Sequence, residues 1–121
     1  MPNLNAALGL AQLEQLKSFV QIKRRIADEY SNFFSGTEIE FIKEPLDSES
    51  NYWLNSILLK DKKERDAFLK FSNEHGVMTR PAWELISRLP MFSNAQRGDV
   101  TNSEWIADRL VNLPSSVIPE K

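Results

Sequence analysis

Arg80 is the residue of this sequence whose surroundings best suit it to bind a ligand. A short apolar run precedes it, and Pro81 and Trp83 follow it at once. Because a proline favours extended geometry in the residue before it, Gly76–Arg80 is predicted to be a strand or extended segment that delivers Arg80 to a loop. The planar fork of donors on a guanidinium matches carboxylates and phosphates. The alternative, which composition alone favours, is a structural arginine whose stem packs on Trp83 while its head stays in water.

The composition limits which kinds of site the chain can hold. Its 121 residues are 41% hydrophobic and 26% charged, which is typical of a globular protein and predicts one domain spanning residues 1–121. The formal net charge of -2 offers no basic excess for nucleic-acid binding. There is no cysteine and His75 is the only histidine, so no thiolate or histidine-cluster metal site is predicted. His75 precedes Gly76 at an expected helix end, where it is predicted to cap carbonyl groups.

The sequence shows neither a catalytic constellation nor a membrane segment. Carboxylates are scattered along predicted helices and turns, and the four glycines are not clustered as in a phosphate-binding loop. No run approaches the ~20 apolar residues of a membrane span, and Met1–Leu8 lacks the basic start of a signal peptide. The lack of cysteine fits a reducing compartment. We therefore expect a cytoplasmic protein that contacts no membrane, and no catalytic residue is assigned.

The N-terminal segment is predicted to be a helix over Leu4–Gln15, with Asn3 as its N-cap. Four leucines and several small residues spread apolar surface around most of its circumference: Leu4, Leu8, Leu10 and Leu13, with Ala6, Ala7, Gly9 and Ala11. A helix that is apolar on most sides requires burial on most sides. Because a chain of this size would struggle to cover it, we expect a missing domain or a partner subunit to bury it.

A second helix is predicted over Leu16–Phe34, because apolar residues recur there at the i, i+3, i+4 spacing. It carries the basic cluster Lys23-Arg24-Arg25, which could bind an anion. Asp28 and Glu29 lie within helical reach of the cluster and are expected to pair with it. The cluster is therefore interpreted as a solvated face.

The middle of the chain predicts a small antiparallel sheet. Thr37–Lys43 alternates apolar and charged residues, which is typical of a half-buried strand. Asn51–Lys60 is apolar on both faces and is predicted to be a central strand that pairs with the first. A third, short strand is predicted at Val77–Met78.

Two helices are predicted after these strands. The first runs from the N-cap Asp61 to Gly76, with Phe68 and Phe71 placing it on the sheet. The second follows the loop Ser93–Val100, where Thr101 and Glu104 fit a capping box, and a turn over Asn112–Ser116 ends it. This order of elements predicts an α+β sandwich in which a small antiparallel sheet packs with helices.

Four pieces of the sequence resemble one enzyme family, in the order in which that family has them. They are Met1–Leu16, Asn51–Asn55, Gly76–Trp83 and Val111–Ser116. The family is that of the DegT/DnrJ-type sugar-nucleotide aminotransferases, which use pyridoxal 5'-phosphate and have fold type I, the fold of the aspartate aminotransferases. The Thr-Arg-Pro-x-Trp piece with Leu-Pro-Met-Phe after it is most similar to members that aminate 4-keto sugars on the route to bacillosamine or legionaminic-type acids.

The resemblance implies that the chain is the C-terminal small domain of a larger, dimeric aminotransferase. Family members run to about three times this length, a two-domain size. Their large domain carries the cofactor-binding lysine, the acidic partner of the pyridine nitrogen and most of the phosphate cradle. No lysine here lies in a matching context. The chain is therefore expected to resemble an excised domain whose Met1 falls inside a family motif, to bind no cofactor and to be inactive alone.

The resemblance also implies contacts for four residues. In the family the active site lies at a dimer interface, and the segment matching Met1–Ala7 runs near the active site of the neighbouring subunit. Asn3 and Asn5 are therefore candidates for contacts to cofactor phosphate or substrate, with helix capping as the alternative for Asn3. Arg80 and Trp83 would face the cleft, where Arg80 would meet the anionic sugar nucleotide that receives the amino group of an amino-acid donor. Domain packing is the alternative for Arg80.

A free-standing α+β interaction module that binds acidic ligands through Arg80 is the competing interpretation. It predicts a monomer whose first helix is packed in place, whereas the aminotransferase interpretation predicts that Leu4–Leu13 is exposed in this chain. In the aminotransferase interpretation Arg80 is expected to be partly exposed and without a partner. A buried ion pair within the domain would instead make it structural.

Overall fold

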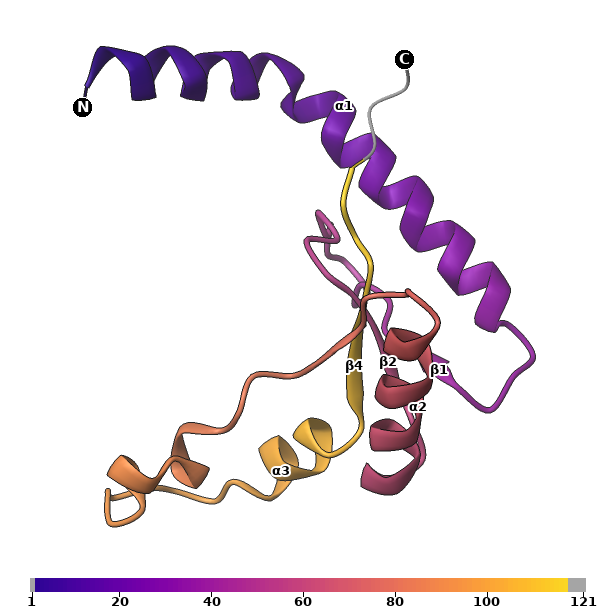
Figure 1. Cartoon of the computed structure of the whole chain (residues 1–121). Coiled ribbons are helices and arrows are strands. Elements are labelled where there is room, and N and C mark those ends of the chain that lie inside the picture. Colours follow the sequence, from indigo (N-terminus) through magenta and orange to yellow (C-terminus); the bar gives the residue numbers. More distant parts are fainter. Residues whose placement is uncertain (1, 118–121) are drawn as a thin grey trace.

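The computed structural model of the chain describes residues 2–117. Two helices dominate it, and a small sheet, a third helix and two 3-10 turns complete the described part (Figure 1). The elements in order are α1 (Asn3–Phe34), β1 (Glu40–Phe41), β2 (Asn55–Leu58), α2 (Lys62–Glu74), β3 (Arg80–Pro81), η1 (Ile86–Arg88), η2 (Pro90–Phe92), α3 (Thr101–Ala107) and β4 (Leu110–Leu113). None of the helices within residues 2–117 is both long enough and apolar enough to cross a membrane.

The sheet is antiparallel throughout, with the strand order β1-β2-β4-β3. The predicted pairing of the first two strands is confirmed, and β2 lies inside the sheet as expected. Both strands are shorter than predicted, and the expected strand at Val77–Met78 is wrong because β3 begins only at Arg80. The α+β fold class is confirmed.

Strand β4 is the strand that the sequence did not predict. Leu110 continued the apolar pattern of the preceding helix, and Asn112 next to Pro114 is typical of a turn. In the structure the four residues alternate between half-buried and buried, and β4 pairs with β2 on one side and β3 on the other. A strand this short carries too few residues to show a period of two, so only its neighbours define it.

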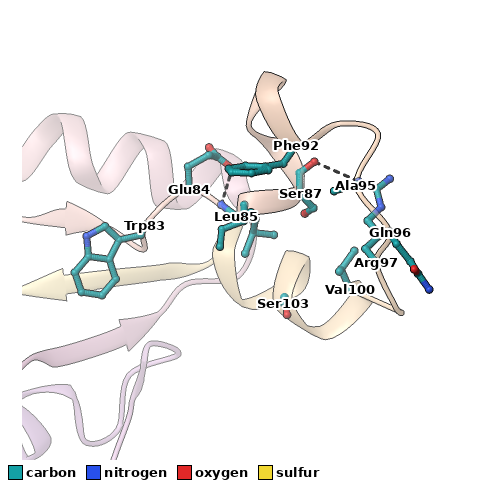
Figure 2. Close-up of a pocket in the computed structure, with 11 residues that line it drawn as sticks. Trp83, Glu84, Leu85, Ser87, Phe92, Ala95, Gln96, Arg97, Val100 and Ser103 are labelled. Atoms are coloured by element: carbon teal, nitrogen blue, oxygen red, sulfur yellow. Dashed lines mark hydrogen bonds between the residues drawn. The ribbon is translucent and has the colours of Figure 1, made fainter.

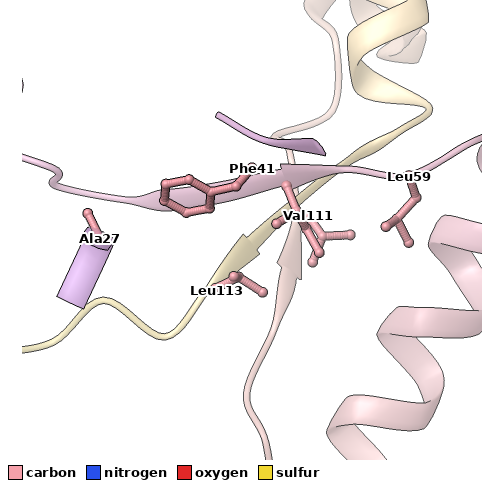
Figure 3. Close-up of a cluster of buried hydrophobic side chains, with 6 residues drawn as sticks. Ala27, Phe41, Leu59, Val111 and Leu113 are labelled. Atoms are coloured by element: carbon pink, nitrogen blue, oxygen red, sulfur yellow. The ribbon is translucent and has the colours of Figure 1, made fainter. Parts of the chain in front are cut away.

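The core lies on one face of the sheet. Phe41, Ile57 and Val111 are paired side by side across β1, β2 and β4, and the last two side chains have no exposed surface. Figure 3 shows Phe41 and Val111 in this cluster. Ala27 of α1 belongs to the same cluster, and Phe68 of α2 packs against it. Both long helices therefore cover the same face. Other members of the cluster or its border are Leu59, Leu113, Tyr30, Phe34, Ile39, Tyr52 and Leu69.

Phe71 does not lie on the sheet as predicted. Its side chain is exposed, and its ring stacks at 4.1 Å on the ring of His75 one turn later. Helical spacing alone cannot tell which of two aromatic residues three positions apart faces the core, because the apolar stripe of α2 is narrow.

Helix α1 is one continuous helix of 32 residues rather than two. It begins at Asn3 itself, after Pro2, and no side chain caps its first turn, so the predicted N-cap at Asn3 is wrong. The first turns project away from the sheet (Figure 1). Leu4 is 81% exposed, and Leu8, Leu10 and Leu13 are also exposed. As expected, the rest of the described chain does not cover this apolar surface.

The basic cluster on α1 is not a simple solvated face. Lys23 Nζ donates to the backbone carbonyls of Trp53 at 3.3 Å and Ser115 at 2.6 Å. Arg24 forms a forked pair with Glu44 at 2.6 and 3.0 Å, and it also donates to the Ser50 carbonyl at 2.7 Å. The predicted pairing within α1 is therefore wrong for Lys23 and Arg24. The tertiary fold brings better acceptors to them than Asp28 and Glu29.

The ends of α2 follow the prediction, whereas the start of α3 does not. Asp61 accepts from the backbone N–H of Glu64 at 2.9 Å, and His75 Nδ1 lies 2.8 Å from the Phe71 carbonyl. The expected capping box at Thr101 is absent. Instead Asp99 accepts from both the backbone N–H and the hydroxyl of Thr101, at 2.9 and 2.6 Å. The N–H of Glu104, which the Thr101 hydroxyl was expected to accept, donates to the backbone carbonyl of Val100 at 2.9 Å.

Candidate functional site

Arg80 lies on the edge strand β3 and is paired with Asn112 of β4, which in turn is paired with Ser56 of β2. Residues directly opposite each other in an antiparallel sheet project to the same face, and neighbours along a strand alternate. Because Ile57 and Val111 are buried on the core face, the row Ser56–Asn112–Arg80 belongs to the opposite face. We call this opposite side the open face of the sheet.

Arg80 is exposed, and within residues 2–117 its guanidinium donates to the sulfur of Met78 at 3.5 Å. A thioether is a weak acceptor, so the fork of N–H donors remains free to bind a stronger one. No described carboxylate lies within ion-pair distance of Arg80. The prediction that Arg80 is exposed without an ionic partner is therefore confirmed for this part of the chain.

The other arginines are engaged by the fold. Arg24, Arg65 and Arg88 pair with carboxylates of Glu44, Asp66 and Asp108. Arg97 donates to the Ser87 carbonyl, and Arg109 donates to the carbonyls of Lys60 and Trp105 and stacks over the Trp105 ring. Arg80 thus differs from them in that its guanidinium has neither a carboxylate nor a carbonyl acceptor within residues 2–117.

Two tryptophans stand beside Arg80. The ring centroids of Trp53 and Trp83 lie 6.1 Å apart with their planes tilted by 33°, and the two residues are 63% and 74% exposed. Together with Arg80, Asn112 and Pro114 they line a hollow of about 380 Å³, which we call the open-face pocket. Large indoles left in water next to an unpaired guanidinium are typical of a binding surface.

A second hollow lies on the arm, the segment of residues 82–100 that leaves the end of β3 and projects away from the sheet (Figure 1). It has a volume of about 480 Å³ and is lined by Trp83, Ile86, Phe92 and Val100 among others. Figure 2 shows the Trp83 indole at the sheet end of this hollow, so Trp83 borders both hollows.

One ion pair ties the arm to the end of α3. Arg88 donates to Asp108 at 3.1 Å, and this hydrogen bond is the main cause that lowers the pKa of Asp108 and raises that of Arg88. Glu84 lies 3.8 Å from the same guanidinium. Both partners are partly exposed, so the pair orients the arm rather than stabilising the core.

The structure does not bring the four predicted contact residues together. Arg80 and Trp83 share the open-face pocket. Asn3 and Asn5 are exposed on the first turn of α1, which projects away from the sheet (Figure 1). No hydrogen bond within residues 2–117 joins either asparagine to the pocket. The contacts predicted for Asn3 and Asn5 would thus require a segment or a partner outside the described residues.

The described lysines do not form a site for pyridoxal phosphate. Lys23 is the one with a lowered pKa, which burial causes, but two backbone carbonyls hold its amino group. Lys62 and Lys70 pair with Asp66 and Glu74 one turn along α2. No group of acidic and histidine side chains able to hold a metal ion occurs within residues 2–117. These three lysines therefore do not fit the role of a cofactor-binding lysine, and no step through the cofactor is assigned to them.

Comparison with known proteins gives this arrangement a context. The sequence profile of the DegT/DnrJ/EryC1/StrS aminotransferase family matches residues 1–118. The chain belongs to this family. It is similar to GDP-perosamine synthase of Vibrio cholerae, with 34% identity over 118 residues that make up 95% of this chain and 32% of the relative. It is also similar to dTDP-4-amino-4,6-dideoxy-D-glucose transaminase of Escherichia coli, with 30% identity over 94% of this chain and 33% of the relative.

Solved structures share the fold. The PLP-form of Spr1654 from Streptococcus pneumoniae superposes with a TM-score of 0.86 at 23% identity and covers 97% of this chain and 31% of that protein. Helicobacter pylori PseC, an aminotransferase involved in the biosynthesis of pseudoaminic acid, superposes with a TM-score of 0.80 at 19% identity, over 89% of this chain and 30% of that protein. The chain thus spans about a third of the length of the proteins it matches.

Asn112 and Trp53 are two pocket residues with a polar or aromatic side chain that the sequence did not single out for binding. Asn112 was assigned to a turn, and only the β3–β4 register places it opposite Arg80. Trp53 was assigned to a central strand, yet it precedes β2 and lies in an irregular segment after Tyr52, whose φ of 44° is left-handed. A left-handed conformation at a tyrosine is uncommon and cannot be read from residue types.

Proposed function

We propose that the chain is the C-terminal domain of a pyridoxal-phosphate-dependent aminotransferase that transfers an amino group to a 4-keto sugar nucleotide. The observation that carries this proposal is the family match over residues 1–118, with relatives about three times as long. The two curated relatives named above are called a perosamine synthase and an amino-sugar transaminase, and both names refer to nucleotide-linked sugars. A cytoplasmic location is part of the proposal.

The apolar surface of α1 supports the proposal that this domain packs against a larger one. Five leucines of the first half of α1 are exposed: Leu4, Leu8, Leu10, Leu13 and Leu16. Leaving so much apolar surface in water is unfavourable by about 1.5–3 kcal/mol for each side chain that could be fully buried. We infer that the large domain of the enzyme, together with a second subunit, covers this half of α1.

In the whole enzyme the cofactor would act as electron sink, and the large domain would supply the residues that hold it. The residues described here would bind and orient the substrate. Arg80 would donate its fork of N–H groups to an anionic group of the sugar nucleotide, and Trp83 would form part of the wall beside it. Asn3 and Asn5 would contact the cofactor phosphate or the substrate of the neighbouring subunit.

A transamination assay tests the proposal. The complete polypeptide that contains this chain should convert a 4-keto sugar nucleotide to the amino sugar with glutamate as donor. The 121-residue chain alone should show no turnover. Turnover by the 121-residue chain, or none by the complete polypeptide with any 4-keto sugar nucleotide, would contradict it.

The competing function, a free-standing module that binds acidic ligands through Arg80, predicts a first helix that packs on its own domain. The exposure of Leu4 and Leu13 favours the aminotransferase. Amide hydrogen exchange over residues 4–15 distinguishes the two, because an uncovered helix opens and exchanges faster than one packed on a core.

A further inference from the structure

The second half of α1 holds the backbone on two sides of the open-face pocket. Lys23 Nζ donates to the carbonyls of Trp53 and Ser115. The Tyr30 hydroxyl donates to the carbonyl of Pro114 at 3.0 Å, and both Trp53 and Pro114 line the pocket. We propose that Lys23 is a positioning residue of the enzyme, which acts on substrate binding by fixing Trp53 in its place. The inference rests on the proposed function and deepens it, because Lys23 does not itself line the pocket.

The segment that carries Trp53 has a conformation that its own residues disfavour. Trp53 precedes β2, and Tyr52 before it has a φ of 44°. This left-handed conformation is uncommon for a residue other than glycine and is an outlier for a bulky one. Such a conformation persists only where surrounding contacts impose it, and it is typical of functional sites. Contacts from outside the segment are therefore needed to hold the turn at Tyr52.

Arg24 of α1 supplies such contacts just before the turn. It donates to the Ser50 carbonyl at 2.7 Å and to both oxygens of Glu44, and Glu44 accepts from the Ser50 N–H at 2.7 Å. The guanidinium carbon of Arg24 lies 5.6 Å from the centroid of the Tyr52 ring. The Tyr52 hydroxyl accepts from the backbone N–H of Glu44 at 3.3 Å. Arg24 thus ties the N-terminal side of the turn to α1.

Lys23 ties the other side of the turn to α1, at Trp53 itself. Its Nζ lies 3.3 Å from the Trp53 carbonyl and 2.6 Å from the Ser115 carbonyl. Burial lowers the pKa of Lys23, so its ammonium group is partly withdrawn from water and the carbonyls replace that water. Without this donor the Trp53 carbonyl loses its tie to α1 next to the strained turn. The Trp53 indole, whose centroid lies 6.1 Å from that of Trp83, would then lose its fixed position in the pocket.

The alternative is that Lys23 only stabilises the fold. A tie of that kind would change the fraction of folded enzyme, and this fraction affects the reactions of both substrates equally. A positioning residue of the pocket instead affects the sugar nucleotide alone, because Arg80 and Trp83 are proposed to meet that substrate. The ratio of the two kcat/KM values, one for the sugar nucleotide and one for glutamate, therefore distinguishes the two roles.

Steady-state kinetics of the complete polypeptide measure this ratio. Lys23→Met should lower kcat/KM for the sugar nucleotide about three- to tenfold, at most the usual effect of losing one charge-assisted hydrogen bond, and should leave kcat/KM for glutamate unchanged. Lys70→Met is the matched control, because Lys70 is an exposed lysine of α2 whose partner Glu74 lies 4.0 Å away. It should leave both values unchanged. An equal fall of both values for Lys23→Met would overturn the proposal.

A second substitution shows whether Lys23 acts through Trp53. When Trp53 is already replaced, in Trp53→Ala, the further change Lys23→Met should not alter the ratio again. A full additional effect would overturn the proposal. If Lys23→Met does not fold, Arg24→Lys keeps the charge, removes the forked contact with Glu44 and should alter the same ratio in the same direction. An unaltered ratio for the folded Arg24→Lys enzyme would then overturn the proposal.

The 121-residue chain reports on the tie directly. Its three tryptophans give three indole N–H signals in a 15N-labelled sample, and Trp105 lies outside the pocket and serves as an internal control. The heteronuclear NOE of the Trp53 indole should fall in Lys23→Met and stay constant in Lys70→Met, with Trp105 constant in both. An unchanged NOE of Trp53 in Lys23→Met would show that Lys23 does not fix this side chain.

The failure of this inference can be told from a failure of the proposed function. If the complete polypeptide aminates a 4-keto sugar nucleotide and Lys23→Met leaves the ratio unchanged, Lys23 is not a positioning residue and the aminotransferase stands. If the complete polypeptide aminates no 4-keto sugar nucleotide, the proposed function is wrong, and the role of Lys23 in substrate binding is wrong with it. The NMR measurement then still decides whether Lys23 fixes Trp53.

Discussion

Removal of the Ser115 hydroxyl should destabilise the chain far more than removal of the Ser116 hydroxyl, because Ser115 is buried and Ser116 is exposed. Ser115 Oγ accepts from the backbone N–H of Asn55 at 2.8 Å and from its side-chain Nδ2 at 3.1 Å. It donates to the Leu113 carbonyl at 2.9 Å. Asn55 and Ser115 are both buried, so Ser115→Ala would strand two donors away from water.

The size of the effect follows from these contacts. Each buried donor left unsatisfied costs about 1–3 kcal/mol, so two of them should lower the free energy of unfolding by roughly 2–4 kcal/mol once some relaxation is allowed. Asn55 already carries a buried oxygen, Oδ1, without a partner among the described residues, so its surroundings offer little compensation. A loss of this size is a large part of the ~5–15 kcal/mol that stabilises a typical domain.

Urea denaturation followed by far-UV circular dichroism measures the loss. For Ser115→Ala the urea midpoint should fall, while the slope of the free energy of unfolding against urea concentration should stay constant. For Ser116→Ala the free energy of unfolding should stay within about 0.5 kcal/mol of that of the unsubstituted chain. Asn55→Ala combined with Ser115→Ala should cost less than the sum of the two single changes, since the stranded amide is then gone. If Ser115→Ala and Ser116→Ala had the same midpoint, the reasoning from stranded donors would be refuted.

Three further predictions concern the core, the ion pair between Arg24 and Glu44, and the exposed first half of α1. Ile57→Val should lower the free energy of unfolding by roughly 1 kcal/mol, because Ile57 is fully buried. Ile86→Val changes an exposed site and should have almost no effect. Equal losses of stability for the two variants in urea would contradict this assignment of the core. The hydrogen bond from Arg24 lowers the pKa of Glu44. The stabilising effect of this ion pair is therefore fully present above the ordinary glutamate pKa of about 4.3. It is lost as the pH falls through the lower pKa that Glu44 has in the folded chain. The midpoint difference between the unsubstituted chain and Glu44→Gln should shrink from pH 6 to pH 3, and an unchanged difference would contradict the pairing of Glu44 with Arg24. Backbone amides of residues 4–15 should exchange much faster than those around Ala27, and strong protection there in a verified monomer would rule out an uncovered helix.

The sequence predicted some features of the Arg80 site, and only the structure revealed others. Pro81 and Trp83 identified an arginine on a stiff segment, and its exposure without an ionic partner is as predicted. The register that sets Asn112 beside it was not predictable, because β4 has four residues and follows a helix with the same apolar pattern. The partners of Lys23 and Arg24 were hidden for a similar reason, since their acceptors lie 20 to 92 residues away in the sequence.

Local chemistry and long-range contacts thus decided different features of this protein. The sequence alone determined the α+β class, the N-cap of α2 at Asp61, the carbonyl cap at His75 and the family, because each depends on residues close together or on motifs in a fixed order. The tertiary structure alone decided the strand β4 and the pairing of Trp53 with Trp83. Their physical cause is contact between segments distant in the chain, and no short window of residues contains both partners.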